Sequence, residues 1–106
     1  MPFDGNENHD ISFDEASILT KRYREKEGSS ARKGGFFGRK AIENLLQQDH
    51  CVGIRYYYGL DSNDEKVLIL VGANSDENDL VKSNHLAFEY SVASPPRSGE
   101  DNMLNS

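Results

Sequence analysis

The spacing of apolar residues follows a helical period in the first half of the chain. Within residues 12–26 it predicts a helix that starts at Ser12, whose hydroxyl can accept a bond from the amide three residues on. Gly28 marks its expected end. A second helix is predicted over residues 38–48. Its apolar face consists of Ile42, Leu45 and Leu46.

From Cys51 onward the period changes to two, which is typical of strands. Residues 51–60 and 67–72 are predicted to form a hairpin, and residues 86–92 a third strand. Residues 67–71 are apolar at both odd and even positions, so this strand should be covered on both faces and lie centrally in the sheet. The side chains expected on the buried face of the first strand are Val52, Ile54, Tyr56, Tyr58 and Leu60.

These elements predict an α+β fold in which two N-terminal helices pack on one face of a three-stranded antiparallel meander, in the order ααβββ. We expect one small domain over residues 11–93. Residues 1–10 and 94–106 are polar, show no periodic apolar face, and are expected to be disordered.

Composition narrows the class of protein. The chain has 106 residues, of which 36% are hydrophobic, and a net charge of -6. No apolar run approaches the 18 or so residues that cross a bilayer. The N-terminus is acidic where a secretory signal would be basic and then apolar, and a lone Cys51 cannot form an internal disulfide. We therefore expect a cytoplasmic protein.

The sequence contains no recognisable catalytic constellation. His50 beside Cys51 could activate a thiol, but neighbouring strand residues point to opposite faces. The three histidines are scattered without metal-ligand spacing, and residues 61–72 lack the glycine and the glutamate of a calcium loop. We expect no catalytic residue, no metal and no cofactor, and hence a protein that is not an enzyme.

The face opposite the predicted core carries few charges. Arg55 and Tyr57 share it with aliphatic residues of the central strand and with Glu89 of the third strand. An apolar centre with so few polar groups resembles a partner surface, unless the chain's own first helix or tail covers it. We therefore expect a non-enzymatic protein–protein interaction module that binds another protein or its own copy through Arg55, Tyr57 and Glu89. An acidic inhibitor, an immunity-type protein and a homo-oligomer are forms of this hypothesis.

An alternative rests on the uneven distribution of charge. Residues 21–40 carry eight bases and two acids, between two acidic stretches. This basic segment is either a solvated helix face paired with the chain's own acids or a site for an anion or single-stranded nucleic acid, although the net charge argues against general attraction to nucleic acid. The candidate anion-binding residues are Arg32, Lys33, Phe36, Phe37, Arg39 and Lys40.

Three runs of sequence resemble a family of small uncharacterised proteins of Bacteroidetes-type bacteria. They are FFGRKAIENLLQQ at 36–48, CVGIRYYYGL at 51–60 and LVGAN at 70–74, and TKRYR at 20–24 is similar to the same family. The resemblance covers about residues 11–80. It implies a compact α+β domain in a bacterial cytoplasm and no particular activity.

Overall fold

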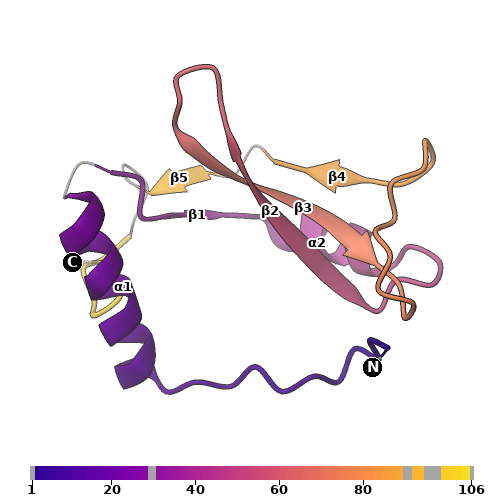
Figure 1. Ribbon diagram of the computed structural model, residues 1–106, viewed down its shortest axis with the longest axis horizontal. Coiled ribbons are helices and arrows are strands. Elements are labelled where there is room, and N and C mark those ends of the chain that lie inside the picture. Colours follow the sequence, from indigo (N-terminus) through magenta and orange to yellow (C-terminus); the bar gives the residue numbers. More distant parts are fainter. Residues whose placement is uncertain (1, 29–30, 90–91, 95–98, 106) are drawn as a thin grey trace. The chain divides into compact units, whose positions relative to one another are not determined.

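The structure is a computed structural model, which describes residues 2–28, 31–89, 92–94 and 99–105. Contacts between Cα atoms divide the chain into two compact units. One consists of residues 1–8 and 37–91, and the other of residues 9–36 and 92–106. Two helices and a three-stranded antiparallel sheet confirm the α+β class (Figure 1).

The first unit is built on the sheet β2-β3-β4. Its strands are β2 (Gly53–Leu60), β3 (Lys66–Ala73) and β4 (Ala87–Phe88), and both pairings are antiparallel. In the register, Arg55 pairs with Val71 and Tyr57 with Ile69, while Val71 also pairs with Ala87. The aliphatic strand is therefore central, as its two-sided apolar pattern predicts.

The core of this unit lies on β3 and on the helix α2 (Arg39–Leu46). Val67, Leu70, Val71 and Ala73 are buried, so both faces of β3 are shielded from water. Gly38 precedes α2 as its N-cap, and Leu45 is fully buried. The helix lies where its apolar spacing predicts it, although it ends two residues earlier.

The loops that follow β2 and β3 are held by the same kind of hydrogen bond, from backbone N–H groups to a side-chain oxygen. In the hairpin loop, Asp61 accepts hydrogen bonds at its Oδ1 from the N–H groups of Asn63 and Glu65, at 2.8 and 3.0 Å. After β3, Asn74 Oδ1 accepts from the N–H groups of Asp76 and Asn78, both at 3.0 Å. In each loop a side-chain oxygen accepts bonds that a backbone carbonyl would otherwise accept, and this closes the chain into a turn. Asp and Asn favour such turns.

The first eight residues of the chain belong to the same unit. The Phe3 N–H donates to the Ser75 carbonyl at 3.1 Å. The Glu7 carboxylate accepts from the N–H groups of Asp4 and Gly5, both at 3.0 Å, and the bond from Asp4 is the main cause that lowers the pKa of Glu7. These bonds fold the segment back on itself.

The second unit contains the helix α1 (Phe13–Glu27) and a two-stranded sheet of β1 (Gly34–Phe36) and β5 (Val92–Ser94). The Ser12 hydroxyl accepts from the Glu15 N–H at 3.0 Å, and Gly28 ends the helix with a φ of +90°. Both ends of α1 therefore agree with the sequence. No side chain of α1 is buried, in keeping with its sparse apolar positions.

The predicted order ααβββ is not confirmed. The strand β1 precedes α2, and β1 pairs with β5, so a second sheet exists that the sequence did not predict. Of the third predicted strand, over residues 86–92, Ala87 and Phe88 form β4, whereas Val92 begins β5 and pairs with Phe36 in the other sheet. Residues 90 and 91 lie outside the described part of the chain. The run Gly34–Phe36 is too short and too rich in glycine to show a period of two. Among the described residues, no helix combines the length and the hydropathy that crossing a bilayer requires.

Gly72→Ala should destabilise the first unit. The added Cβ would lie 2.9 Å from both Cys51 Sγ and Gln48 Nε2, and 3.2 Å from Leu80 Cδ1, so packed side chains would have to move. We expect a loss of about 1–3 kcal/mol in the free energy of unfolding, measured by urea denaturation. The matched control is Gly53→Ala, whose Cβ would meet nothing within 4 Å. Equal losses in the two variants would contradict the packing described.

Candidate protein-binding surface

One face of the hairpin exposes a continuous row of large side chains, which we call the hairpin surface. It consists of Tyr56, Tyr58 and Leu60, alternate residues of β2. Their exposed fractions are 56%, 68% and 68%. The expectation that these three side chains are buried is therefore wrong.

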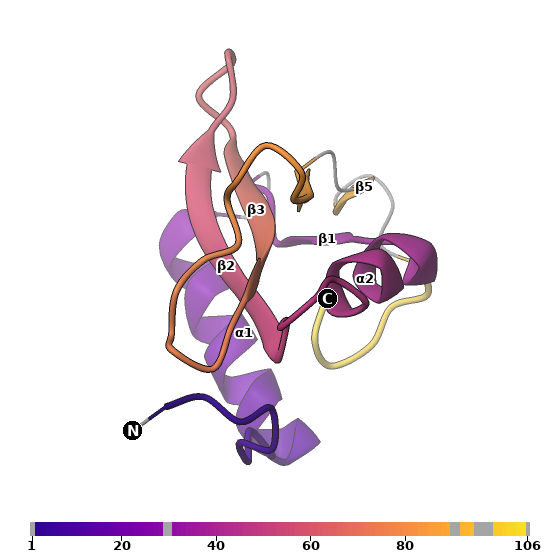
Figure 2. The same ribbon diagram turned by 90° about the vertical axis from the view of Figure 1, so that its right-hand side faces the viewer.

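The reason lies in what α2 covers. On the same face of the sheet, Gly72 lies close to Gln48 and Cys51, just beyond the end of α2, so the helix packs at that end of the hairpin. Figure 2 shows the tip of the hairpin standing clear of α2. The alternating pattern therefore continues along β2 for longer than the helix that covers it.

Contacts along this face hold the exposed rings in place. The rings of Tyr56 and Tyr58 meet edge to face, with centroids 5.7 Å apart and planes at 81°. Lys66 Nζ lies 5.4 Å from the centroid of the Tyr58 ring, at a distance where a cation is attracted to an aromatic face. These contacts restrict the two rings in the free protein, which lowers the entropic cost of binding.

The outer edge of β2 also presents backbone groups. Gly72 accepts from the Leu80 N–H at 2.9 Å, so its carbonyl points away from β2. Its partner Ile54 must therefore turn its own N–H and carbonyl away from β3, because antiparallel pairs alternate between bonded and non-bonded. The same holds at every second residue, which includes Tyr56 and Tyr58. Among the strands that the structure describes, none pairs with this edge.

On the other face, a group that we call the Asp79 cluster joins Phe3, Arg55, Tyr57 and Asp79. Arg55 Nη1 lies 2.6 Å from Asp79 Oδ1 in a half-buried ion pair and donates to the Glu77 carbonyl at 3.0 Å. The Tyr57 hydroxyl donates to the other carboxylate oxygen of Asp79. The guanidinium of Arg55 also lies over the ring of Phe3, at 5.4 Å from its centroid.

The carboxylate of Asp79 sets the electrostatics of this cluster. The hydrogen bond that Tyr57 donates to Asp79 is the main cause that raises the pKa of the phenol above its ordinary value. The hydrogen bond to Asp79 likewise raises the pKa of the Arg55 guanidinium. Both shifts favour the protonated side chains. The cluster ties β2 to the loop after β3, and the sequence alone gave no sign that Asp79 is their common partner.

The structure brings together only two of the three residues predicted to bind a partner. Arg55 and Tyr57 meet at Asp79, whereas Glu89 follows the last residue of β4, two strands away from them. Their role in partner binding stays a prediction. Since Arg55 and Tyr57 already bind Asp79, the side chains most available on β2 are those of the hairpin surface.

The predicted anion-binding residues are divided between the two units. Arg32, Lys33 and Phe36 belong to the second unit, and Phe37, Arg39 and Lys40 belong to the first. An anion site that uses all six stays a prediction.

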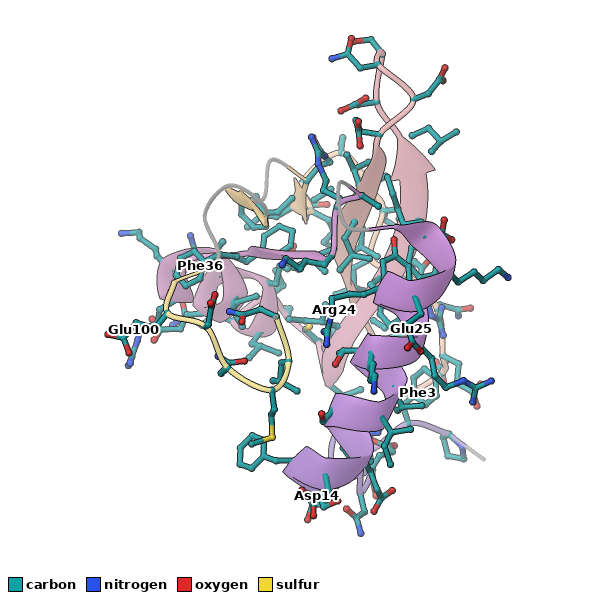
Figure 3. All side chains as sticks on the ribbon, turned by 90° about the vertical axis from the view of Figure 1, so that its left-hand side faces the viewer. Phe3, Asp14, Arg24, Glu25, Phe36 and Glu100 are labelled. Atoms are coloured by element: carbon teal, nitrogen blue, oxygen red, sulfur yellow. The ribbon has the colours of Figure 1, made fainter. Side chains whose placement is uncertain are left out.

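Side chains beside α1 line a cavity of about 340 Å³. Arg24 Nη1 donates to the Leu104 carbonyl at 2.6 Å, and Figure 3 shows its side chain reaching from α1 toward the C-terminal loop. Lys33 Nζ donates to the Asn105 carbonyl. Two cations of the cavity are therefore bound by the chain's own backbone. The lining residues are Lys21, Tyr23, Arg24, Glu25, Gly28, Ala31 and Lys33.

Cys51 is half-buried, and its thiol donates to the Gly53 carbonyl at 3.2 Å. Its sulfur also lies against Gly72. This environment is that of a packed side chain. Within residues 2–28, 31–89, 92–94 and 99–105, no group of three His, Cys, Asp or Glu side chains is placed to hold a metal ion.

Comparison of the chain with protein-family models, with curated proteins and with solved structures gave no match.

Tyr57→Phe should change how stability depends on pH. Because the folded-state pKa of Tyr57 is raised, its contribution is complete below the unfolded-state pKa of about 10 and is lost as pH rises through the folded-state value. We expect the stability advantage of the wild type over Tyr57→Phe to shrink above pH of about 10. Urea denaturation followed by circular dichroism at several pH values measures it.

The matched control is Tyr58→Phe, which removes a hydroxyl for which the described residues provide no carboxylate acceptor. It reports the effect of losing a phenol hydroxyl that does not bind Asp79. A Tyr57→Phe difference that stays constant over this pH range would contradict the hydrogen bond to Asp79.

Proposed function

We propose that this chain is a non-enzymatic protein–protein interaction module and that the hairpin surface is its contact with the partner. The observation that carries the proposal is the exposure of Tyr56, Tyr58 and Leu60 side by side on one strand. Apolar groups left together in water favour association, because covering them releases about 25 cal/mol per Å².

The residue types and their order support the same conclusion. Tyrosine is enriched at interfaces, since it combines a large apolar ring with a hydroxyl that can stay hydrated at the rim. The contact between Tyr56 and Tyr58, and that of Lys66 with Tyr58, restrict these rings in the free protein. A preorganised aromatic row of this kind is typical of binding sites rather than of ordinary surface.

The Asp79 cluster contributes rigidity to this module. It links β2 to the loop after β3 through the ion pair of Arg55 with Asp79 and the bond from Tyr57. Because these bonds lie on the opposite face of the same strand, they hold the backbone that carries the hairpin surface. Cytoplasmic residence is a further part of this proposal and rests on charge and composition. An acidic inhibitor, an immunity-type protein and a homo-oligomer are the alternative forms that such a module could take.

A crosslinking experiment tests the module. The tagged wild type, the double variant Tyr58→Ser/Leu60→Ser and the control Val81→Ser are incubated in host lysate, crosslinked with a lysine-reactive reagent and analysed by mass spectrometry. Val81 is 71% exposed in the loop between β3 and β4 and is not part of the hairpin surface, so it matches the loss of an exposed apolar side chain. We expect crosslinks to a protein, either another species or a second copy, that the double variant loses at least tenfold and the control keeps. Equal yields from all three proteins would overturn the proposal.

A further inference from the structure

We propose that the partner is a second copy of this chain, which pairs antiparallel with the outer edge of β2 to form a continuous six-stranded sheet. This inference rests on the proposed function, because it names the occupant of the same hairpin. It goes beyond a contact between side chains, since the backbone of β2 supplies the hydrogen bonds.

The edge of β2 lacks the features that normally prevent strand pairing. Proteins protect edge strands with proline, lysine, bulges or very short length. The strand β2 has eight residues, contains neither proline nor lysine, and pairs with β3 residue for residue from Gly53 to Leu60. Its only charged residue, Arg55, is bound to Asp79 on one face of the sheet. Among the described strands, none pairs with the outward backbone groups of β2.

The sequence of β2 is complementary to itself in one antiparallel register. With Tyr57 on the two-fold axis, Tyr56 of one copy lies opposite Tyr58 of the other, and Ile54 lies opposite Leu60. These residues have the outward backbone groups, so they become the hydrogen-bonded pairs of the new ladder. All their side chains lie on one face, and they extend the hairpin surface of one copy into that of the other.

Charge favours the same arrangement. In this register Arg55 of each copy faces Gly59 of the other, so no like charges meet across the new ladder. The acidic hairpin loop, with Asp61, Asp64 and Glu65, lies at opposite ends of the dimer because the strands run antiparallel. Parallel pairing would bring the two acidic loops side by side, at a cost for a chain that already carries a net charge of -6.

The surface area that the two copies can bury sets the expected affinity of the dimer. The three tyrosine rings of β2 present roughly 200 Å² each when fully exposed, and about half of that is free. With Leu60, each copy would bury several hundred Å², which is less than the roughly 800 Å² per partner of a standard stable interface. The dimer should therefore be reversible, with a dissociation constant on the order of micromolar or weaker.

Sedimentation velocity over a concentration series tests the dimer, with Tyr58→Pro as the first variant. Proline removes the outward N–H of residue 58, which the ladder between β2 and β3 does not use, so the hairpin can persist while edge pairing is blocked. We expect the wild type and Tyr58→Phe to dimerise as concentration rises. Tyr58→Pro should stay monomeric with the circular dichroism of the wild type. A wild type that is monomeric up to roughly millimolar concentration would overturn the inference.

A disulfide test fixes the register and does not depend on how Tyr58→Pro folds. In a Cys51→Ser background, Tyr57→Cys places two thiols at the two-fold axis, where non-hydrogen-bonded neighbours are close enough for a disulfide. Leu60→Cys is the matched control, because its two thiols would lie about 20 Å apart, six residues along the ladder. We expect a covalent dimer on mild oxidation from Tyr57→Cys alone. Equal crosslinking of both variants would overturn the register.

The outcomes separate the two proposals. A monomeric wild type whose crosslink to a different protein is lost in the Tyr58→Ser/Leu60→Ser variant would overturn self-pairing and leave the proposed function standing. A monomeric wild type with no crosslink that depends on these two residues would overturn both.

Discussion

The two-sided burial of β3 is the constraint on which the first unit depends. A strand that is apolar at both odd and even positions needs a cover on each face. Its backbone N–H and C=O groups, once buried, also need a paired neighbour at each edge. The strands β2 and β4 provide the edges, and Leu45, Leu80 and the turn after β3 contribute to the cover. Because β3 takes the centre of a three-stranded sheet, β2 is left with one paired edge and one open edge.

The mismatch in length between helix and hairpin then creates the hairpin surface. An eight-residue helix is about 12 Å long, whereas an eight-residue strand extends over about 27 Å. The helix α2 can cover only the part of the sheet near Gly72 and Ile54. The remainder of β2 keeps the alternation of a core strand beyond the reach of α2, and Tyr56 and Tyr58 are exposed there.

The opposite face shows how few polar contacts can organise a small sheet. Asp79 receives Arg55 on one carboxylate oxygen and Tyr57 on the other. Its position follows from the preceding turn, in which Asn74 Oδ1 accepts from two backbone N–H groups and Glu77 adopts a φ of +68°. A local turn thus positions the Asp79 carboxylate, which binds Arg55 and Tyr57, two residues of β2 that lie more than twenty positions earlier in the sequence.

The sequence by itself determined the elements whose signal is local. The helix start at Ser12, the stop at Gly28 and the central position of the Val67–Gly72 strand all follow from neighbouring residues, and the structure agrees with them. Only the tertiary structure decided that β1 pairs with β5, that Asp79 binds Arg55 and Tyr57, and that Tyr56 and Tyr58 are exposed. The physical reason is that periodicity states which side chains share a face, whereas burial of that face depends on how far a separate element reaches across it.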